Sequence, residues 1–293
     1  MRGEPPALLF GATSIVGFTL AQRFRAVVTP VANPFNGSRP AAAWQRLRVE
    51  DAPVLQALLS TRPLPLVIYC HAVCDVAKCE ADPVWARTIN VGSVETLLAL
   101  LPAETRLVYL SSDHVFGGDG LYTEDSPPQP ISVYGQTRVA AEQCVLSRPG
   151  SLVIRAGLSI GPSVNGRTGH LDWLRYRYQR GLPITIVRDE FRSAVWAEDL
   201  AERVMALAAS GVCGLRHVPA HRVVGRPELA RYLMVQQGLP PVFALGRRAQ
   251  QRVPHLGCVE LRSRYADAYS APLPSVVGCA PLPAIASTLS QSL

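Results

Sequence analysis

The sequence predicts an α/β fold in which helices flank a doubly wound parallel sheet, with a smaller lobe towards the C-terminal end. Short apolar runs, among them residues 66–70 and 106–110, are typical of strands buried on both faces. A turn with two glycines, residues 11–17, joins the first run to a helical segment, as in the dinucleotide-binding turn of Rossmann-type sheets. The length of 293 residues suffices for such a domain and an attached substrate lobe.

Composition and charge argue against several classes of protein. The formal net charge is +7, but the basic residues are mostly scattered arginines without a run of five. This pattern argues against nucleic-acid binding and suits a phosphorylated substrate or cofactor. The seven cysteines form no C-x-x-C motif and residues 1–6 do not resemble a signal peptide, so we expect a reduced, cytoplasmic protein. The apolar runs are too short for a membrane span.

The first strand is expected over residues 7–10, directly before the glycine turn. Gly11 permits the sharp turn, and Gly17 allows the next helix to pack closely on the strand. Ser14 stands at the middle position, where its hydroxyl can donate to a phosphate. The N–H groups at the start of the helix attract a pyrophosphate. The residues that we predict to bind the cofactor here are Gly11, Thr13, Ser14, Ile15, Val16 and Gly17.

The end of the second strand, residues 27–31, distinguishes NADP from NAD. An acidic residue there would bind the ribose 2′-hydroxyl of NAD. The sequence instead has Asn33 and Arg39, and no acid before Glu50, which favours the 2′-phosphate of NADP. A solvated loop residue is the alternative interpretation of Arg39. We therefore expect NADP(H) to be preferred over NAD(H).

A histidine and three cysteines lie near the end of the third strand, residues 66–70. We interpret His71 as a hydrogen-bonded loop residue rather than as a base or a metal ligand. Cys70, Cys74 and Cys79 make a zinc site conceivable. Their spacings lack the usual zinc-knuckle pattern, so we predict no metal site.

A hydroxyl, a phenol and a guanidinium mark the expected catalytic site. Ser112 follows the apolar run 106–110, and Tyr134 opens an amphipathic segment. Arg138 comes one helical turn after Tyr134, on the same face. Its positive charge favours the phenolate and lowers the pKa of Tyr134, which suits proton donation to a carbonyl that is being reduced. Ser112 can hydrogen-bond the same carbonyl oxygen.

The remaining elements follow from the same patterns. Residues 117–130 form a loop rich in glycine, aspartate and proline. We expect an NAD(P)-binding core over residues 1–156 and a substrate lobe over 157–293, with core elements returning at about 184–210. The further strands that we expect are at 151–156 and 184–187. The further helices are at 54–61, 91–101, 170–179 and 226–236, with one more helix that ends at residue 210.

Two strings resemble the motifs of a known family. They are SSDHVF, residues 111–116, and YGQTR, residues 134–138. They resemble S-T-D-Y-V-F and Y-G-x-S-K of the extended short-chain dehydrogenases/reductases, in the dTDP-4-dehydrorhamnose reductase-like branch. The resemblance implies that Tyr134 is the general acid, that Ser112 supplies the hydroxyl, that Asp113 assists proton traffic and that Arg138 replaces a lysine. The further residues that it implies at the cofactor are His71, Ala72, Val73, Asn90, Ser111, Gly157 and Leu158.

The resemblance implies an NADPH-dependent reductase of a ketone, typically a 4-keto sugar nucleotide. Guanidinium groups suit the diphosphate of such a substrate. The resemblance is compatible with a homodimer but does not require one. The residues that we expect at the substrate are His114, Arg167 and Arg192, with Arg175 and Arg177 as further candidates.

Four departures from the family pattern leave two alternatives open. One is an NADP-binding regulatory subunit without catalysis. The other is a non-redox enzyme, such as a dehydratase, a cyclase or an epimerase. The departures are Ser14, Arg48, His71 and Arg138.

Overall fold

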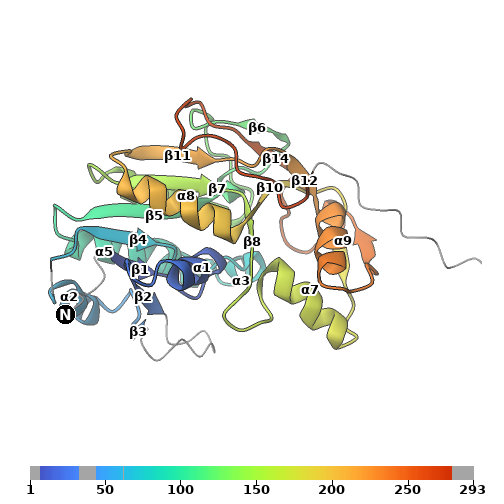
Figure 1. Cartoon of the computed structure of the whole chain (residues 1–293), viewed down its shortest axis with the longest axis horizontal. Coiled ribbons are helices and arrows are strands. Elements are labelled where there is room, and N and C mark those ends of the chain that lie inside the picture. Colours follow the sequence, from blue (N-terminus) through green and yellow to red (C-terminus); the bar gives the residue numbers. More distant parts are fainter. Residues whose placement is uncertain (1–6, 33–43, 62, 279–293) are drawn as a thin grey trace, which may run out of the picture.

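The structure, a computed structural model, describes residues 7–32, 44–61 and 63–278. Within these ranges a seven-stranded sheet forms the centre of the molecule, and each neighbouring pair of its strands is parallel (Figure 1). The spatial order is β11 (Gly214–Val218), β7 (Leu152–Ala156), β5 (Arg106–Ser112), β4 (Leu66–Tyr69), β1 (Ala7–Phe10), β2 (Val28–Ala32) and β3 (Gln45–Arg46). The chain runs from β1 to β2 and β3 on one side and then returns to β4 on the other. In open parallel sheets, ligands bind at the carboxyl ends of the two strands on either side of such a reversal, here β1 and β4.

Helices cover both faces of the central sheet, because its strands are apolar on both faces. All four residues of β1 are buried, for example. On one face Leu20 and Leu200 join the apolar core, and on the other Leu55 and Leu97 do so. The helices on the first face are α1 (Ile15–Arg23) and α8 (Ala197–Ala209). Those on the second are α2 (Ala52–Leu59), α5 (Ser93–Leu100) and α6 (Val133–Leu146). This two-sided arrangement confirms the predicted Rossmann-type fold.

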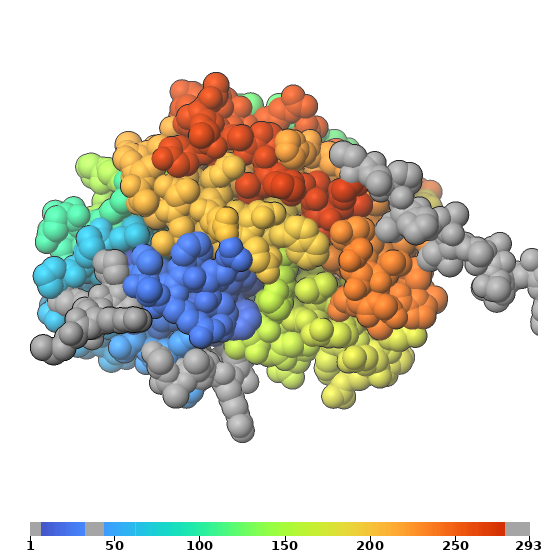
Figure 2. Space-filling model, in the orientation of Figure 1, coloured from blue at the N-terminus to red at the C-terminus, as the bar shows by residue number. Residues whose placement is uncertain are grey.

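A smaller lobe lies beside the central sheet. Figure 2 shows its yellow-green surface next to the blue N-terminal segment and its orange surface beyond the yellow-green one. Its helices pack around a separate apolar core that contains Leu174, Leu229 and Leu233. These helices are α7 (Gly169–Gln179) and α9 (Arg226–Gln236). One lobe sheet contains β12 (Val223–Gly225), β10 (Phe191–Trp196), β14 (Cys258–Leu261) and β6 (Gly120–Tyr122), with β8 (Leu158–Ile160) also paired to β10. A second sheet contains β9 (Thr185–Val187) and β13 (Ala244–Gly246).

Several short helical turns complete the described part of the chain. A π-helical turn, η1, interrupts the path from α4 into α5 and carries Asn90 in a fully buried position. Such turns are frequent at functional sites. The short elements are α3 (Val76–Ala81), α4 (Pro83–Arg87), η1 (Thr88–Gly92), η2 (Asp113–Val115) and η3 (Arg248–Gln250).

The core elements that return after residue 156 differ in part from the expected range of about 184–210. From that range α8 packs on the central sheet, whereas β9 and β10 belong to the smaller sheets. The seventh central strand is β11, which lies beyond the range. Its sequence includes Arg216 and His217, so it lacks the continuous apolar run on which the prediction of strands relied. Asn33 and Arg39 lie outside the described residues.

Candidate active site

The turn between β1 and α1 forms a backbone cradle in which two positions require glycine. Gly11 has φ of 76°, and a Cβ there would overlap the backbone carbonyl of Cys70. A Cβ at Gly17 would overlap the backbone oxygen of Gly11. Ser14 is the N-cap of α1, and its Oγ accepts a hydrogen bond of 3.0 Å from the backbone N–H of Gly17. The turn therefore fits a dinucleotide phosphate at a helix N-terminus.

The loop after β4 is held by Asn90. Its Oδ1 accepts a hydrogen bond of 2.7 Å from the N–H of Val73, and its Nδ2 donates to the carbonyl of Val73 at 3.0 Å. Nδ2 also donates to Oγ1 of Thr137 on α6, at 2.9 Å. His71 lies 3.4 Å from Oε1 of Glu50 through its Nε2. Asn90 thus fixes the 71–73 segment, including Ala72, against the helix that carries Tyr134.

Two charged side chains from α6 hold the end of β5. Arg138 donates from Nη2 to the carbonyl oxygen of Leu110, and the hydroxyl of Ser111 donates to Glu142. Glu142 is also paired with Arg155, at 2.6 Å between Oε2 and Nη2, and all three charged side chains are buried. The Ser111 hydroxyl therefore points to Glu142. The two bonds fix the backbone immediately before Ser112.

Ser112 and Tyr134 come together at this strand end. Tyr134 lies in the first turn of α6, whose N-cap Ser132 accepts from the N–H of Gly135 at 3.0 Å. A hydrogen bond with Ser112 is one of the interactions that lower the pKa of the Tyr134 phenol. The Ser112 hydroxyl donates to Oδ1 of Asp113 at 3.2 Å and accepts from the N–H of His114 at 3.3 Å.

Arg138 lies near the phenol of Tyr134, and its charge opposes the effect of burial on the pKa of that phenol. Burial raises the pKa of Tyr134 above its ordinary value, while the positive charge of Arg138 lowers it. The Cζ atom of Arg138 is 4.7 Å from the ring centroid of Tyr109 and 6.0 Å from that of Tyr134. Nε and Nη1 of Arg138 are buried and have no hydrogen-bond partner among the residues that the structure describes. A bound ligand is the natural acceptor for such donors.

Arg192 reaches this site from the lobe, but its guanidinium is directed at protein carboxylates. Its Nε donates to Oδ2 of Asp113 at 2.6 Å and its Nη2 donates to Oδ1. Its Nη1 lies 3.2 Å from Oε1 of Glu190 and 3.4 Å from Nε2 of His114. Glu190 is further bonded to Nδ1 of His255 at 2.8 Å. Arg192, expected at a substrate diphosphate, instead pairs with carboxylates of the protein beside the end of β5.

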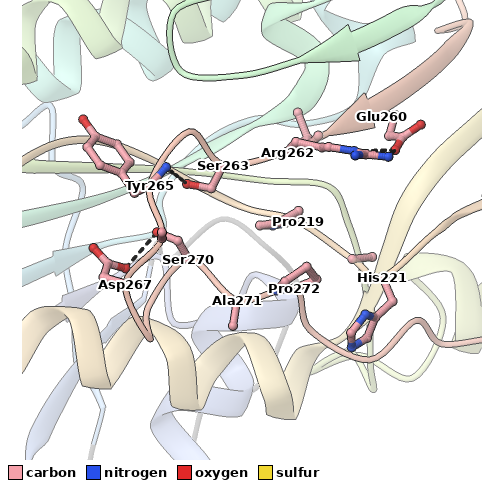
Figure 3. A pocket seen from close by; sticks show the side chains of 13 residues that line it. Pro219, His221, Glu260, Arg262, Ser263, Tyr265, Asp267, Ser270, Ala271 and Pro272 are labelled. Carbon is pink, nitrogen blue, oxygen red and sulfur yellow. Dashed lines mark hydrogen bonds and ion pairs between the residues drawn. The ribbon is translucent and has the colours of Figure 1, made fainter.

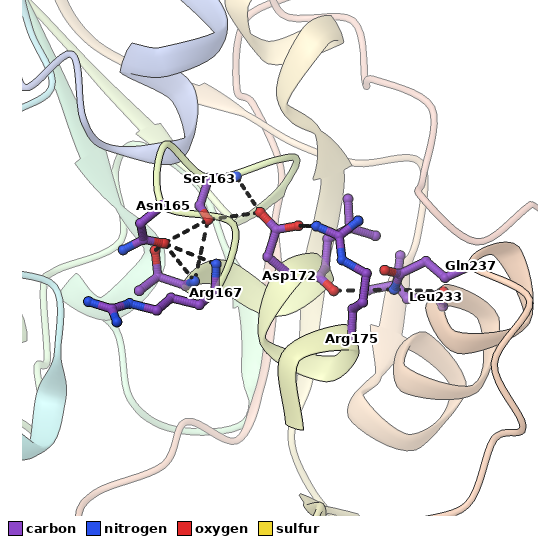
Figure 4. Close-up of polar contacts among 9 residues, drawn as sticks. Ser163, Asn165, Arg167, Asp172, Arg175, Leu233 and Gln237 are labelled. Atoms are coloured by element: carbon purple, nitrogen blue, oxygen red, sulfur yellow. Dashed lines mark hydrogen bonds and ion pairs between the residues drawn. The ribbon is translucent and has the colours of Figure 1, made fainter. Parts of the chain in front are cut away.

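Arg167 lies elsewhere, on the exposed loop before α7. Asp172 anchors this loop because it accepts hydrogen bonds from both the backbone N–H and the hydroxyl of Ser163, and it pairs with Arg175 (Figure 4). In Figure 4 the side chain of Arg167 extends away from Asp172 and Arg175. Arg177 donates to the carbonyl of Pro183 at 2.7 Å. These arginines do not join the group around Ser112.

Gly157 and Leu158 lie where the chain passes from the core to the lobe. A Cβ at Gly157 would overlap the backbone oxygen of Ser193. Leu158 pairs with Ala194 in the neighbouring strand β10. The two residues therefore bring β10, and with it Arg192, close to the end of β7.

Several residues of the site had not been identified from the sequence. Glu142 lies in the amphipathic segment that Tyr134 opens, and the sequence pattern assigns it no role. Arg155 and Glu190 are charged residues within or beside apolar strands. A charged residue in such a place indicates that it is buried beside a partner of opposite charge. His255 had no local signal.

A hollow lies at the end of β11 (Figure 3). Its volume is about 510 Å³, and its polar lining includes His221, Glu260, Arg262 and Asp267. Among the described residues, no group of three or more His, Cys, Asp or Glu could hold a metal ion. No helix in the described part of the chain has both the length and the apolar character needed to cross a membrane.

Comparison with known proteins connects these features to one family. The model of the RmlD substrate binding domain matches residues 6–254. A probable dTDP-4,6-dihydroxy-2-methyloxan-3-one 4-ketoreductase of Streptomyces antibioticus is 32% identical over 72% of this chain and 70% of its own. A dTDP-4-keto-6-deoxy-D-glucose reductase of Streptomyces niveus is 28% identical over 88% of this chain and 86% of its own.

A solved structure has the same fold. The crystal structure of a dTDP-4-dehydrorhamnose reductase from Bacillus anthracis, in complex with NADP, superposes with a TM-score of 0.77. The match covers 93% of this chain and 96% of the other, at 18% sequence identity.

Proposed function

Because the chain belongs to the RmlD substrate binding domain family, we propose that it is an NADPH-dependent reductase of a ketone carried by a sugar nucleotide. The proposal rests on one arrangement. Ser112, Tyr134 and Arg138 meet at the carboxyl end of β5, and the glycine cradle lies at the carboxyl end of β1 in the same sheet. Relatives named as reductases of dTDP-linked ketones support the substrate class.

The cradle of Gly11, Ser14 and Gly17 would hold the pyrophosphate of the dinucleotide. The unpaired donors of Arg138 would meet the nicotinamide ribose. When bound, the reduced nicotinamide supplies the hydride that the carbonyl carbon accepts. NADP(H) is proposed over NAD(H) because Asn33 and Arg39 follow the second strand without an acid.

Tyr134 would donate its proton to the carbonyl oxygen as the carbon is reduced. Burial keeps the phenol protonated, since it raises the pKa of Tyr134. The nearby charge of Arg138 then stabilises the phenolate that remains after proton donation. Ser112 would hydrogen-bond the same oxygen and stabilise the charge that develops on it.

The test combines binding with turnover. Calorimetric titration with NADPH and NADH is expected to give tighter binding of NADPH. When dTDP-4-keto-6-deoxyglucose and NADPH are added together, we expect the absorbance of NADPH to fall. One 4-hydroxy sugar nucleotide should form for each NADPH consumed. Binding without turnover of any 4-keto sugar nucleotide would favour a regulatory or non-redox role. Absence of binding would refute the proposed cofactor.

A further inference from the structure

The guanidinium of Arg192 contacts four atoms next to the catalytic serine. Its hydrogen bonds reach both carboxylate oxygens of Asp113, Oε1 of Glu190 and Nε2 of His114. Arg192 lies on a lobe strand, β10, whereas Asp113 and His114 follow a strand of the central sheet. Both Arg192 and Asp113 are buried, at 4% and 0% exposure. One side chain of the lobe therefore controls the surroundings of the serine in the core.

The first consequence concerns Ser112. Its hydroxyl donates to Oδ1 of Asp113, which also accepts from Nη2 of Arg192. The two bonds from Arg192 hold the plane of the carboxylate, because a guanidinium matches a carboxylate with two parallel N–H groups. The direction of the Ser112 hydroxyl therefore depends on Arg192. Without this partner the buried carboxylate would be unpaired, which is costly.

The second consequence concerns His114. An arginine is always a hydrogen-bond donor, so Nε2 of His114 is the acceptor in its 3.4 Å contact with Arg192. The proton of a neutral imidazole then sits on Nδ1. Burial, together with the charge of Arg192, lowers the pKa of His114 to about 4, so the ring is neutral at pH 7.

This tautomer leaves a free donor next to the general acid. Nδ1 of His114 is buried and has no hydrogen-bond partner in the described part of the chain. The ring lies edge-on to Tyr134, with 5.1 Å between the centroids. A buried donor without a partner destabilises the protein, because it has lost its hydrogen bonds to water. A ligand oxygen beside Tyr134 would satisfy it.

We propose that Arg192 is a positioning residue that orients the Ser112 hydroxyl through Asp113 and holds His114 in the Nδ1–H form, as a donor to a substrate oxygen near the reacting carbonyl. The inference rests on the proposed ketone reduction. It names two contacts that the substrate must make: one at its carbonyl and one at a neighbouring hydroxyl or ring oxygen. A sugar offers both.

A purely structural ion pair between lobe and core is the competing explanation. It predicts that changes at Arg192 alter stability alone. The positioning role predicts in addition a fall in kcat and a change in the tautomer of His114. The tautomer is measured without turnover, so it separates a failure of this inference from a failure of the proposed function.

The experiment uses the full chain with NADPH and compares the wild type with Arg192→Lys. Lysine keeps the charge but cannot bridge both oxygens of Asp113 and still reach His114. The matched control is Arg222→Lys, because Arg222 is paired with Glu228 at 2.6 Å in the lobe, away from the serine. Long-range ¹H–¹⁵N NMR gives the protonated nitrogen of His114, which is assigned with His114→Asn. Steady-state rates with the 4-keto sugar nucleotide give kcat and KM.

We expect the wild type and Arg222→Lys to hold the Nδ1–H form. In Arg192→Lys we expect a shift toward the Nε2–H form and a fall in kcat of about 10- to 100-fold, as for misplaced reacting groups. Wild-type protein in the Nε2–H form would overturn the inference, even if Arg192→Lys does not fold. An Arg192→Lys variant with unchanged tautomer and kcat would also overturn it. If the wild type reduces no ketone, the proposed function fails, and the tautomer still decides the role of Arg192.

Discussion

Arg138 donates from Nη2 to the backbone carbonyl oxygen of Leu110, two residues before Ser112. The same helix, α6, therefore carries Tyr134, the proposed general acid, and holds the strand that carries Ser112. A lysine donates hydrogen bonds from one nitrogen, whereas an arginine donates from three nitrogens that share a single charge. Arg138 uses one of its nitrogens for the strand, and the other two, Nε and Nη1, are buried without a partner among the described residues.

Arg138→Lys is expected to keep or raise kcat, because the charge that stabilises the Tyr134 phenolate remains. Arg138→Met is expected to lower kcat by about 100-fold or more, in the range of general acid–base effects. Stopped-flow rates with saturating NADPH measure both. The control is Arg148→Met. Arg148 follows the C-terminal end of α6, far from Tyr134 along the helix, and donates hydrogen bonds to backbone carbonyls in the loop after α5. Undiminished kcat in Arg138→Met would contradict the role of the charge.

Gly17→Ala is expected to abolish cofactor binding, because its Cβ would overlap the backbone oxygen of Gly11 and distort the cradle. Calorimetric titration with NADPH measures the loss. The matched control is Gly92→Ala, a helical glycine around which a Cβ meets no atom within 4 Å. We expect Gly92→Ala to bind NADPH as the wild type does. Unchanged affinity in Gly17→Ala would show that the cradle does not hold the cofactor.

Glu142→Gln is expected to destabilise the fold by about 3–5 kcal/mol, because it leaves the buried charge of Arg155 without its partner. The midpoint of urea unfolding reports this loss. Glu202→Gln is the control, since Glu202 pairs with Arg23 at the exposed surface. Its unfolding midpoint is expected to stay close to that of the wild type. Equal midpoints for the two variants would argue against a buried ion pair.

Stability is expected to fall as the pH is lowered from neutral to about 4. In the folded state the pKa of His114 lies at about 4, below its ordinary value near 6.5, because burial disfavours the charged ring. Between these values the unfolded chain binds more protons than the folded one, so acid favours unfolding. The contribution of His114 is about 3 kcal/mol. The pKa of His170 is lowered by burial in the same direction.

Urea unfolding at a series of pH values, in the wild type and in His114→Asn, measures how much of the loss of stability in acid comes from His114. The variant is expected to lose less stability on acidification. His221→Asn is the control, because His221 is exposed. Parallel pH profiles for the wild type and His114→Asn would mean that the pKa of His114 is the same in the folded and unfolded states, which would contradict the effect of burial.

The local parts of the site could be predicted from the sequence. The glycine turn and the segment from Ser112 to Arg138 each lie within one strand–helix unit, so their spacing alone indicates which residues share a face. The family and the fold followed from these motifs, and both are confirmed.

The contacts between distant segments could not be predicted. Arg192 bonds to Asp113 across 79 residues, and His255 bonds to Glu190 across 65. Neither contact leaves a periodic pattern, because the first depends on how the lobe packs on the core and the second on how distant segments of the lobe pack together. The strand β11 was missed for a related reason, since an edge strand tolerates polar residues that a central parallel strand excludes.

The most direct measurement compares Tyr134→Phe with the wild type, using a 4-keto sugar nucleotide and NADPH. Phenylalanine keeps the buried ring but removes the proton donor. We predict that Tyr134→Phe binds NADPH with nearly unchanged affinity and oxidises none of it above the rate without enzyme. Equal turnover in Tyr134→Phe would contradict proton donation by this tyrosine.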